Sequence, residues 1–481
     1  MTRFLALTGL LLAALNTAAS SLQEQVDAYV AQSRQAQGIA VALLTPEELT
    51  RAVSGQAGPN GVVSEDTLFE IGSVTKVLTG LLLAQLSDDG VVSLDTTLGD
   101  LMPEPWALDP AVAAIRLQEL ATHTSGLPRL PNNPSMLWRQ IARPADPYAG
   151  LSNEDIFAAV ADLAAEDVST RGEFAYSNLG PALLGRLLEV AAGEPYETLL
   201  EERVLAPLGL DQTTFTDRVL DDPGLARPHR ENLRPARHWR LDAYNPAGGL
   251  SADLEDMITL LQAAMAAEPG SPLAASMAMH WAAESGEQAS GLGWAISERD
   301  GERMIWHNGR TGGYYAFIGV LPDSGRGLVM LSNTSHAGDG FAFSLLRGDD
   351  SPPAPERNWF LLGLTLVLVP LAPMMVFGLR SQARATLEGA AKKPVDRFHF
   401  AGTMIETTFV LALIWKLGVW NVVPLAYWWA GLIATLGLLV LALLLVPRLP
   451  WWQPASRSRF ALRWAGVGFT MVLMLWALLL L

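Results

Sequence analysis

The chain has 481 residues, half of them apolar, and a formal net charge of −16. Residues from 351 onward hold 11 Lys and Arg against 4 Asp and Glu, a net charge of +7, which leaves −23 for residues 1–350. Such an acidic first part argues against nucleic-acid binding, because that function requires basic patches. The chain has no cysteine, which excludes disulfides, thiolate catalysis and Cys-based metal sites.

The first 20 residues have the pattern of a secretory signal peptide. Arg3 precedes an apolar run that ends near Leu15, and small residues follow, with cleavage expected near Ala19 or Ser20. Because the run is short for a bilayer span, an uncleaved N-terminal anchor is the alternative interpretation. A signal peptide would send the domain that follows, residues 21–346, out of the cytoplasm.

The domain after the signal peptide alternates between strand and helix patterns. Its two ends read as strands, with an apolar run at the start and three runs joined by short Gly- or Asp-bearing turns near the end. Residues 73–90 have a helical apolar pattern closed by Gly90, and residues 110–265 are mostly helix-like. We therefore expect an α+β fold in which an antiparallel sheet, completed by both ends of the domain, carries a helical insertion. The expected strands are 38–45, 302–309, 313–322 and 325–334.

Ser73 and Lys76 form the first candidate catalytic pair. Lys76 is the only lysine among the first 350 residues, where every other cation is an arginine. Spaced i and i+3 on a helix, the two side chains share one face, and a buried lysine can act as a base for the serine hydroxyl, whereas arginine stays protonated. The backbone N–H of Ser73, in the first turn of the helix, and that of Arg310 could form an oxyanion hole. An S-x-x-K pattern alone is weak evidence, because many helices contain one.

Two further motifs follow in the order that this chemistry needs. The stretch "EFAYSNLG" gives Tyr176 and Asn178, a tyrosine that could relay a proton to the leaving group and an amide that could hold the lysine and the substrate backbone. The stretch "WHNGRTGGY" gives His307, Asn308 and Gly309, which we expect to line the substrate cleft, with Gly309 allowing close backbone approach. Taken singly, the tyrosine could be an ordinary buried loop residue and the histidine an ordinary strand residue.

The C-terminal region is predicted to be membrane-embedded. A Pro-rich linker, 347–358, leads to four apolar stretches of spanning length, with a soluble helical domain as the alternative. The loops after the first and third stretches carry the cations, whereas the turn "NVVP" carries none, so the positive-inside rule places both basic loops in the cytoplasm and the preceding domain outside. Tryptophans near the expected surfaces fit interfacial belts. The expected spans are about 359–379, 401–420, 425–446 and 464–481.

The three ordered motifs resemble those of the penicillin-recognising serine hydrolases, and within them the class C β-lactamase-like family. The resemblance covers roughly residues 25–345 and includes "LATHTSGLP" and "HNGRTGGYYAF" outside the catalytic residues. It implies a β-lactamase/transpeptidase-like fold and an acyl-enzyme on Ser73, with Lys76 and Tyr176 handling protons. This chemistry needs no metal or organic cofactor.

Two histidines bear on the type of substrate and mechanism. His307 and Asn308 stand where class C β-lactamases have the lysine and threonine of K-T-G, so we expect weak or no β-lactamase activity; a histidine triplet is similar to the aminopeptidase and esterase-like branches. His123 suggests a Ser–His hydrolase when taken alone. The resemblance instead places its segment as a structural loop at the start of the helical domain.

The sequence thus predicts a membrane-anchored, extracytoplasmic serine hydrolase that acts on D-amino acid peptides, peptidoglycan-type peptides or esters. Its expected partners are a small-molecule or peptide substrate and membrane lipid, with no nucleic acid and no protein partner specified. A membrane sensor, in which slow acylation or ligand binding signals through the spans, is the main alternative. A third hypothesis makes the four-helix region a partner-binding or lipid-contact module.

Overall fold

The computed structural model describes residues 21–33, 38–58, 61–131, 136, 138–139, 146–286, 288–299, 301–336, 338–349, 359–420, 422–451, 468–469 and 471–472. The predicted signal peptide (1–20), most of the predicted linker (347–358) and most of the predicted fourth span (464–481) lie outside these residues.

The described part of the catalytic region is built on an antiparallel sheet with the order β3-β2-β1-β12-β11-β10-β9-β8-β7. β1 pairs with β12 from Ile39 opposite Ser332 to Leu44 opposite Gly327, so both ends of the domain complete one sheet, as predicted. The strands are β1 (Gly38–Leu44), β2 (Leu49–Gly58), β3 (Gly61–Val62), β7 (Trp281–Ala282), β8 (Gln288–Ser290), β9 (Ala295–Arg299), β10 (Glu302–Arg310), β11 (Tyr315–Leu321) and β12 (Arg326–Ser332).

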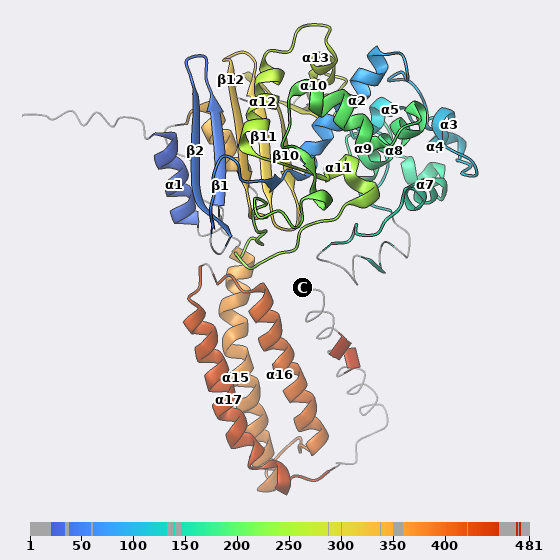
Figure 1. The fold of residues 1–481 in the computed structure, drawn as a ribbon. Helices are drawn as coiled ribbons and strands as arrows, with labels where there is room; N and C mark the ends of the chain where they lie inside the picture. Colours follow the sequence, from blue (N-terminus) through green and yellow to red (C-terminus); the bar gives the residue numbers. More distant parts are fainter. Residues whose placement is uncertain are drawn as a thin grey trace, which may run out of the picture.

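One face of this sheet is covered by the first and last helices of the domain, α1 (Leu22–Ser33) and α14 (Asp339–Arg347) (Figure 1). Tyr29 of α1 stacks on Phe341 of α14 with ring centroids 4.0 Å apart, and both side chains are buried. The two ends of the domain are therefore joined through helices as well as through strands.

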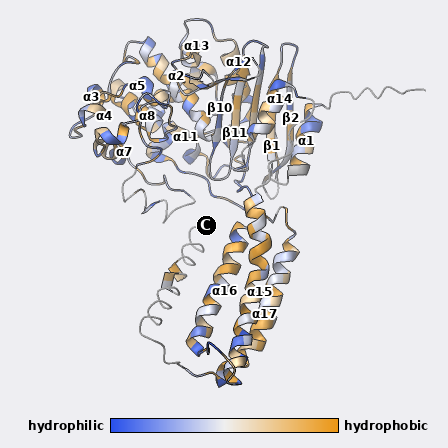
Figure 2. Ribbon diagram, turned by 180° about the vertical axis from the view of Figure 1, so that it is seen from behind, coloured by the Kyte–Doolittle hydropathy of each residue, from blue (hydrophilic) through white to orange (hydrophobic). Residues whose placement is uncertain are grey.

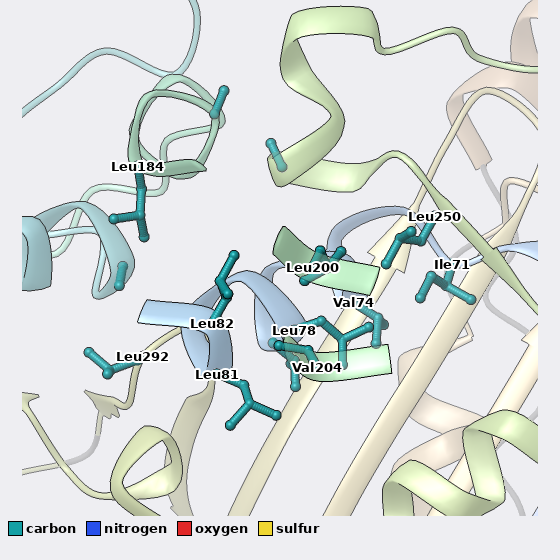
Figure 3. Close-up of a cluster of buried hydrophobic side chains, with 14 of the residues drawn as sticks. Ile71, Val74, Leu78, Leu81, Leu82, Leu184, Leu200, Val204, Leu250 and Leu292 are labelled. Carbon is teal, nitrogen blue, oxygen red and sulfur yellow. The ribbon is translucent and has the colours of Figure 1, made fainter. Parts of the chain in front are cut away.

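The other face carries the helical part and the larger core. α2 (Thr75–Asp88) is buried along most of its length, because apolar residues lie on every side of it. Figure 3 shows Leu78, Leu81 and Leu82 of α2 beside Leu200, Val204 and Leu292. A small sheet, β4-β6-β5, lies beside it, with β4 (Phe69–Glu70), β5 (Thr214–Phe215) and β6 (Leu250–Ala252). The helices of this part are α3 (Leu98–Leu101), α4 (Pro110–Ala113), α5 (Leu117–Ala121), α7 (Asn153–Ala161), α8 (Leu179–Ala192), α9 (Tyr196–Leu200), α10 (Ala206–Leu208), α11 (Asn245–Gly248), α12 (Leu254–Met265) and α13 (Pro272–Met277).

Among the residues that the structure describes, three helices are long and apolar enough to cross a membrane, and they extend from one end of the domain (Figures 1 and 2). They are α15 (Trp359–Leu387), α16 (Arg397–Leu417) and α17 (Leu425–Leu443). Large apolar side chains such as Phe360, Val367 and Ile433 are more than 60 % exposed, an arrangement suited to lipid and costly in water. α15 continues past the predicted end at residue 379, since the polar residues that follow still favour a helix and Arg384 pairs with Glu388 one turn later.

Candidate active site

Ser73 lies at the start of the buried helix. It belongs to a single 3₁₀ turn, Gly72–Val74, that runs directly into α2, so it is one turn before Lys76. This turn is pressed against β10: a Cβ on Gly309 would lie 1.9 Å from the carbonyl oxygen of Ile71. Only glycine permits this approach, which brings the backbone of the strand next to the serine.

The Lys76 amine is buried and aimed at the serine. Its Nζ lies 2.8 Å from Ser73 Oγ and donates a second hydrogen bond, 2.5 Å long, to the carbonyl oxygen of Ala247. Burial, together with the charge of Arg129, lowers the pKa of Lys76 well below that of an ordinary lysine. The environment therefore favours a neutral amine, which can accept a proton.

Close backbone contacts hold the turn of α2 that carries Lys76. A Cβ on Gly293, whose φ is +77°, would lie 2.1 Å from the carbonyl oxygen of Lys76, and a Cβ on Gly80 would lie 2.0 Å from that of Leu292. The glycines let the 291–294 loop lie directly against the helix, so the position of the amine is fixed by backbone packing rather than by side chains alone.

Tyr176 supplies a second hydrogen bond to the serine. Its Oη donates to Ser73 Oγ at 2.7 Å, and burial raises the pKa of Tyr176 despite that hydrogen bond. The ring of His123 lies 4.5 Å from the Tyr176 ring, and His123 Nδ1 accepts a hydrogen bond from the backbone N–H of Ser177. Ser73 thus receives hydrogen bonds from Lys76 and Tyr176. His123 lies in a loop and packs against the ring of Tyr176.

Asn178 presents an unused acceptor close to this centre. Its Nδ2 donates to the hydroxyl of Tyr148 at 3.0 Å, whereas its buried Oδ1 has no hydrogen-bond partner among the described residues. The buried hydroxyl of Tyr244 also lacks a partner in the described part of the chain. Both Asn178 and Tyr244 line the cavity in front of Ser73, so a bound substrate could satisfy these atoms.

The residues of the third motif occupy different environments. His307 is buried and is not among the residues that line the cavity. Burial lowers the pKa of His307 to about 3, so the ring is neutral. Asn308 lines the cavity and donates to Asp339 Oδ1 at 2.6 Å. The Arg310 side chain forms an ion pair with Glu231 and so does not offer a free charge to the cavity.

The cavity in front of Ser73 has a volume of about 250 Å³. Arg129 and Asp339 bring opposite charges to its wall, and Tyr148 and Trp239 add aromatic surface. Sequence reasoning missed these four residues because they come from loops and from the start of α14, outside any motif. The described residues contain no group of three or more His, Asp or Glu side chains placed to hold a metal ion.

Comparisons with known proteins identify the family and the fold of the chain. The Beta-lactamase family model matches residues 22–346. The chain is 28% identical to penicillin-binding protein 4 of Amycolatopsis lactamdurans over 345 residues, which cover 65% of this chain and 84% of that protein. Among solved structures, a class C β-lactamase from Rhodobacter sphaeroides superposes with a TM-score of 0.56 at 19% identity, covering 68% of this chain and 97% of the other. A β-lactamase/D-alanine carboxypeptidase from Yersinia pestis gives 0.55 at 25% identity, covering 65% and 92%.

Proposed function

This chain belongs to the Beta-lactamase family and is a serine hydrolase of that fold, and we propose that it acts at the outer surface of a membrane through an acyl-enzyme on Ser73. The observation that carries the proposal is the pair of hydrogen bonds that Lys76 and Tyr176 make to Ser73 Oγ, at 2.8 and 2.7 Å. A serine hydroxyl between a neutral amine and a phenol has both a base and a proton relay within reach.

In the proposed reaction Ser73 Oγ attacks the carbonyl carbon of an amide or ester while its proton passes to Lys76 Nζ. The proton then reaches the leaving nitrogen or oxygen by way of Tyr176 Oη, and the C–N or C–O bond breaks. Water attacks the acyl-enzyme in the second half, gives up a proton along the same path and restores the serine. The backbone N–H groups of Ser73 and Arg310 are proposed to stabilise the oxyanion, a role supported by the tight contact of Gly72 with the Arg310 backbone.

The charges of the cavity suggest the substrate class. Arg129 can pair with a carboxylate on the substrate, and Asp339 can accept from an amine or amide, so we favour small peptides with D-amino acids over simple esters. This class accords with a relative described as a penicillin-binding protein and a structural neighbour described as a D-alanine carboxypeptidase. A neutral His307 and an Arg310 already paired with Glu231 support the expectation of weak or absent β-lactamase activity.

The membrane placement rests on charge and on the direction of the helices. The domain adjoins the ends of α15 and α16 near Trp359 and Leu417. Arg380 lies in the opposite half of α15, and Lys392 and Lys393 lie in the loop that joins the opposite ends of the two helices. The positive-inside rule then places the basic end in the cytoplasm and the catalytic domain outside.

The test is turnover by the full chain and by Ser73→Ala in parallel. We expect the parent to release D-alanine from D-alanyl-D-alanine peptides and Ser73→Ala to release none, with both proteins melting at the same temperature. Arg129→Gln should raise KM for peptides with a free C-terminal carboxylate and leave KM for the amidated peptides unchanged. Equal turnover by parent and Ser73→Ala would refute the proposed enzyme.

A sensor is the second candidate, favoured by a contact between a loop next to the site and an apolar helix of the C-terminal region. Arg234, in the loop that leads to the cavity-lining Trp239, hydrogen-bonds to the carbonyl oxygen of Trp415 in α16. An acyl-Ser73 that persists for hours in the parent, without product release, would favour this role over that of an enzyme.

A further inference from the structure

An unusual concentration of arginine lies in the segment between the catalytic cavity and the membrane helices. The stretch "RPHRENLRPARHWR", residues 227–240, contains five arginines and one acidic residue, within a domain whose net charge is strongly negative. We call this segment the arginine loop. Because the arginine loop lies at the junction with the helices, its positive charge favours binding of a negatively charged partner from outside the acidic domain.

The arginine loop is fixed to the outer end of α16. Asn232 Nδ2 donates to the carbonyl oxygens of Lys416 and Gly418 at 3.3 and 3.4 Å, and the Arg234 guanidinium hydrogen-bonds to that of Trp415. These carbonyls belong to the last turn of the helix and the residue after it, where no intrahelical donor is available. The domain therefore caps the helix, which holds the loop at a fixed height above the membrane.

The arginine loop lies at the level expected for the lipid headgroups. The rings of Trp415 and Trp428 are tilted against each other with centroids 4.6 Å apart, and Trp420 and Trp429 extend the same cluster. Tryptophans gather at the membrane–water interface because one side of the ring is apolar and its N–H is polar. The Arg234 guanidinium lies 4.7 Å from the Trp415 ring centre, so the arginine loop reaches into this belt.

A cavity of about 310 Å³ opens between the arginine loop, the turn after β10 and the ends of α15 and α16. Its charged lining consists of Arg230, Arg237, Arg310 and Lys416 against the single carboxylate of Glu231, which is paired with Arg310. Leu361 and Leu417 line it on the membrane side. The cavity thus combines a cationic upper part with an apolar floor.

Arg230 is the strongest sign of a missing ligand. Its side chain is half-buried, and its guanidinium has no hydrogen-bond or ion-pair partner among the residues that the structure describes. Burial lowers the pKa of Arg230, and the charge of Arg230 adds to the lowering that burial causes for Arg234. An unpaired, partly desolvated cation beside a second one is costly, and an anion in the cavity would relieve that cost.

We propose that this juxtamembrane cavity binds the phosphate of a membrane lipid headgroup, held between Arg230, Arg237 and Lys416, with the acyl chains leaving past Leu361 and Leu417. The inference rests on the proposed placement of the domain at the outer membrane surface. Because Trp239, Arg310 and Thr311 line both this cavity and the one in front of Ser73, the lipid site adjoins the catalytic site.

The test is lipid binding to the full chain in neutral detergent, measured by native mass spectrometry with phosphatidylglycerol, phosphatidylcholine and inorganic phosphate as probes. We expect saturable binding of phosphatidylglycerol and weaker binding of phosphatidylcholine, whose choline cation the arginines repel. The double variant Arg230→Gln/Arg237→Gln should bind phosphatidylglycerol about thirtyfold more weakly, and the double lysine variant should keep most of the affinity. Arg303→Gln, an exposed arginine near the far end of β10, is the matched control and should bind as the parent does.

Equal phosphatidylglycerol affinity in the parent and the double glutamine variant would overturn the lipid site, as would the absence of any preference for phosphatidylglycerol over phosphatidylcholine. Displacement of the lipid by an equimolar amount of inorganic phosphate would also overturn it, because that result would indicate a site for free anions. Labelling of Ser73 by a fluorophosphonate is measured in every variant and should not change, which shows that the variants fold. Arginine-dependent lipid binding without any labelling of the parent would refute the proposed hydrolase and leave the lipid site standing.

Discussion

Burial of Lys76 controls the pH range in which Ser73 can react. The amine is surrounded by protein and lies in the field of Arg129, and both effects penalise the ammonium form. An exposed lysine would be protonated until about pH 10.4 and could not accept a proton under ordinary conditions. The hydrogen bond from Tyr176 to Ser73 does not replace this base, because burial raises the pKa of the phenol and keeps it protonated.

We predict that the rate of Ser73 acylation rises with pH through the lowered pKa of Lys76 and then levels off. Below that pKa the amine is protonated and cannot take the serine proton; above it further deprotonation adds nothing. The measurement is the rate of fluorophosphonate labelling between about pH 5 and pH 10, with circular dichroism to confirm that the fold persists. A rate that keeps rising toward the pKa of a free lysine, near 10.4, would contradict the assignment.

At the level of elements, the site depends on how closely β10 approaches the turn that carries Ser73. Strand alternation places His307 and Gly309 on one side of β10 and Asn308 on the other. His307 therefore buries its ring and Gly309 makes a backbone contact, whereas the Asn308 amide lines the cavity. The position of Ser73 relative to the strand is therefore set by the absence of a side chain at Gly309.

Gly309→Ala should disrupt this contact. The added methyl would lie 1.9 Å from the carbonyl oxygen of Ile71 and 3.0 Å from the backbone nitrogen of Ser73, so the strand and the turn must separate. We expect a loss of about 1–3 kcal/mol in the free energy of unfolding and a large fall in the acylation rate. Gly61→Ala, in β3, meets nothing within 4 Å and serves as the control. Parent-like labelling and stability in Gly309→Ala would show that the close approach is not needed.

The elements were largely predictable, and the reasons are visible in the sequence. α2 and the strands β1, β10, β11 and β12 follow from apolar periodicity and from short turns. The pairing of Ser73 with Lys76 followed from helical spacing, because both residues lie within one turn. What the sequence could not predict was contact between distant segments: Arg129, Tyr148 and Asp339 reach the cavity only through tertiary packing. Likewise, nothing in the local sequence indicates that His307 is buried rather than presented to the substrate.

For the whole molecule, charge distribution and helix direction together suggest how the chain lies in a membrane. The acidic domain lies at one end of the helices, and the basic loop between α15 and α16 lies at the other (Figure 2). The arginine loop and the tryptophan cluster around Trp415 and Trp428 lie at the end next to the domain. The chain has no native cysteine, so a single introduced cysteine reports the side on which it lies.

Val62→Cys and Ala391→Cys form a matched pair for this topology. Val62 is 70% exposed on the catalytic domain, and Ala391 lies in the loop between α15 and α16. In cells that have lost their outer barriers but keep a sealed membrane, a membrane-impermeant maleimide should label Val62→Cys. It should label Ala391→Cys only after that membrane is permeabilised. The reverse pattern would place the catalytic domain in the cytoplasm and remove the basis for an extracytoplasmic function.

The most direct test of the central claim is the mass of the Ser73-containing peptide after reaction with an acylating probe, in the parent and in Lys76→Arg. The account predicts rapid acylation of Ser73 in the parent and a rate at least about a thousandfold lower in Lys76→Arg, because a guanidinium keeps its proton. Arg303→Lys, the opposite exchange far from the site, should leave the rate unchanged. Acylation of Lys76→Arg at the parent rate, or acylation of the parent at a residue other than Ser73, would contradict the account.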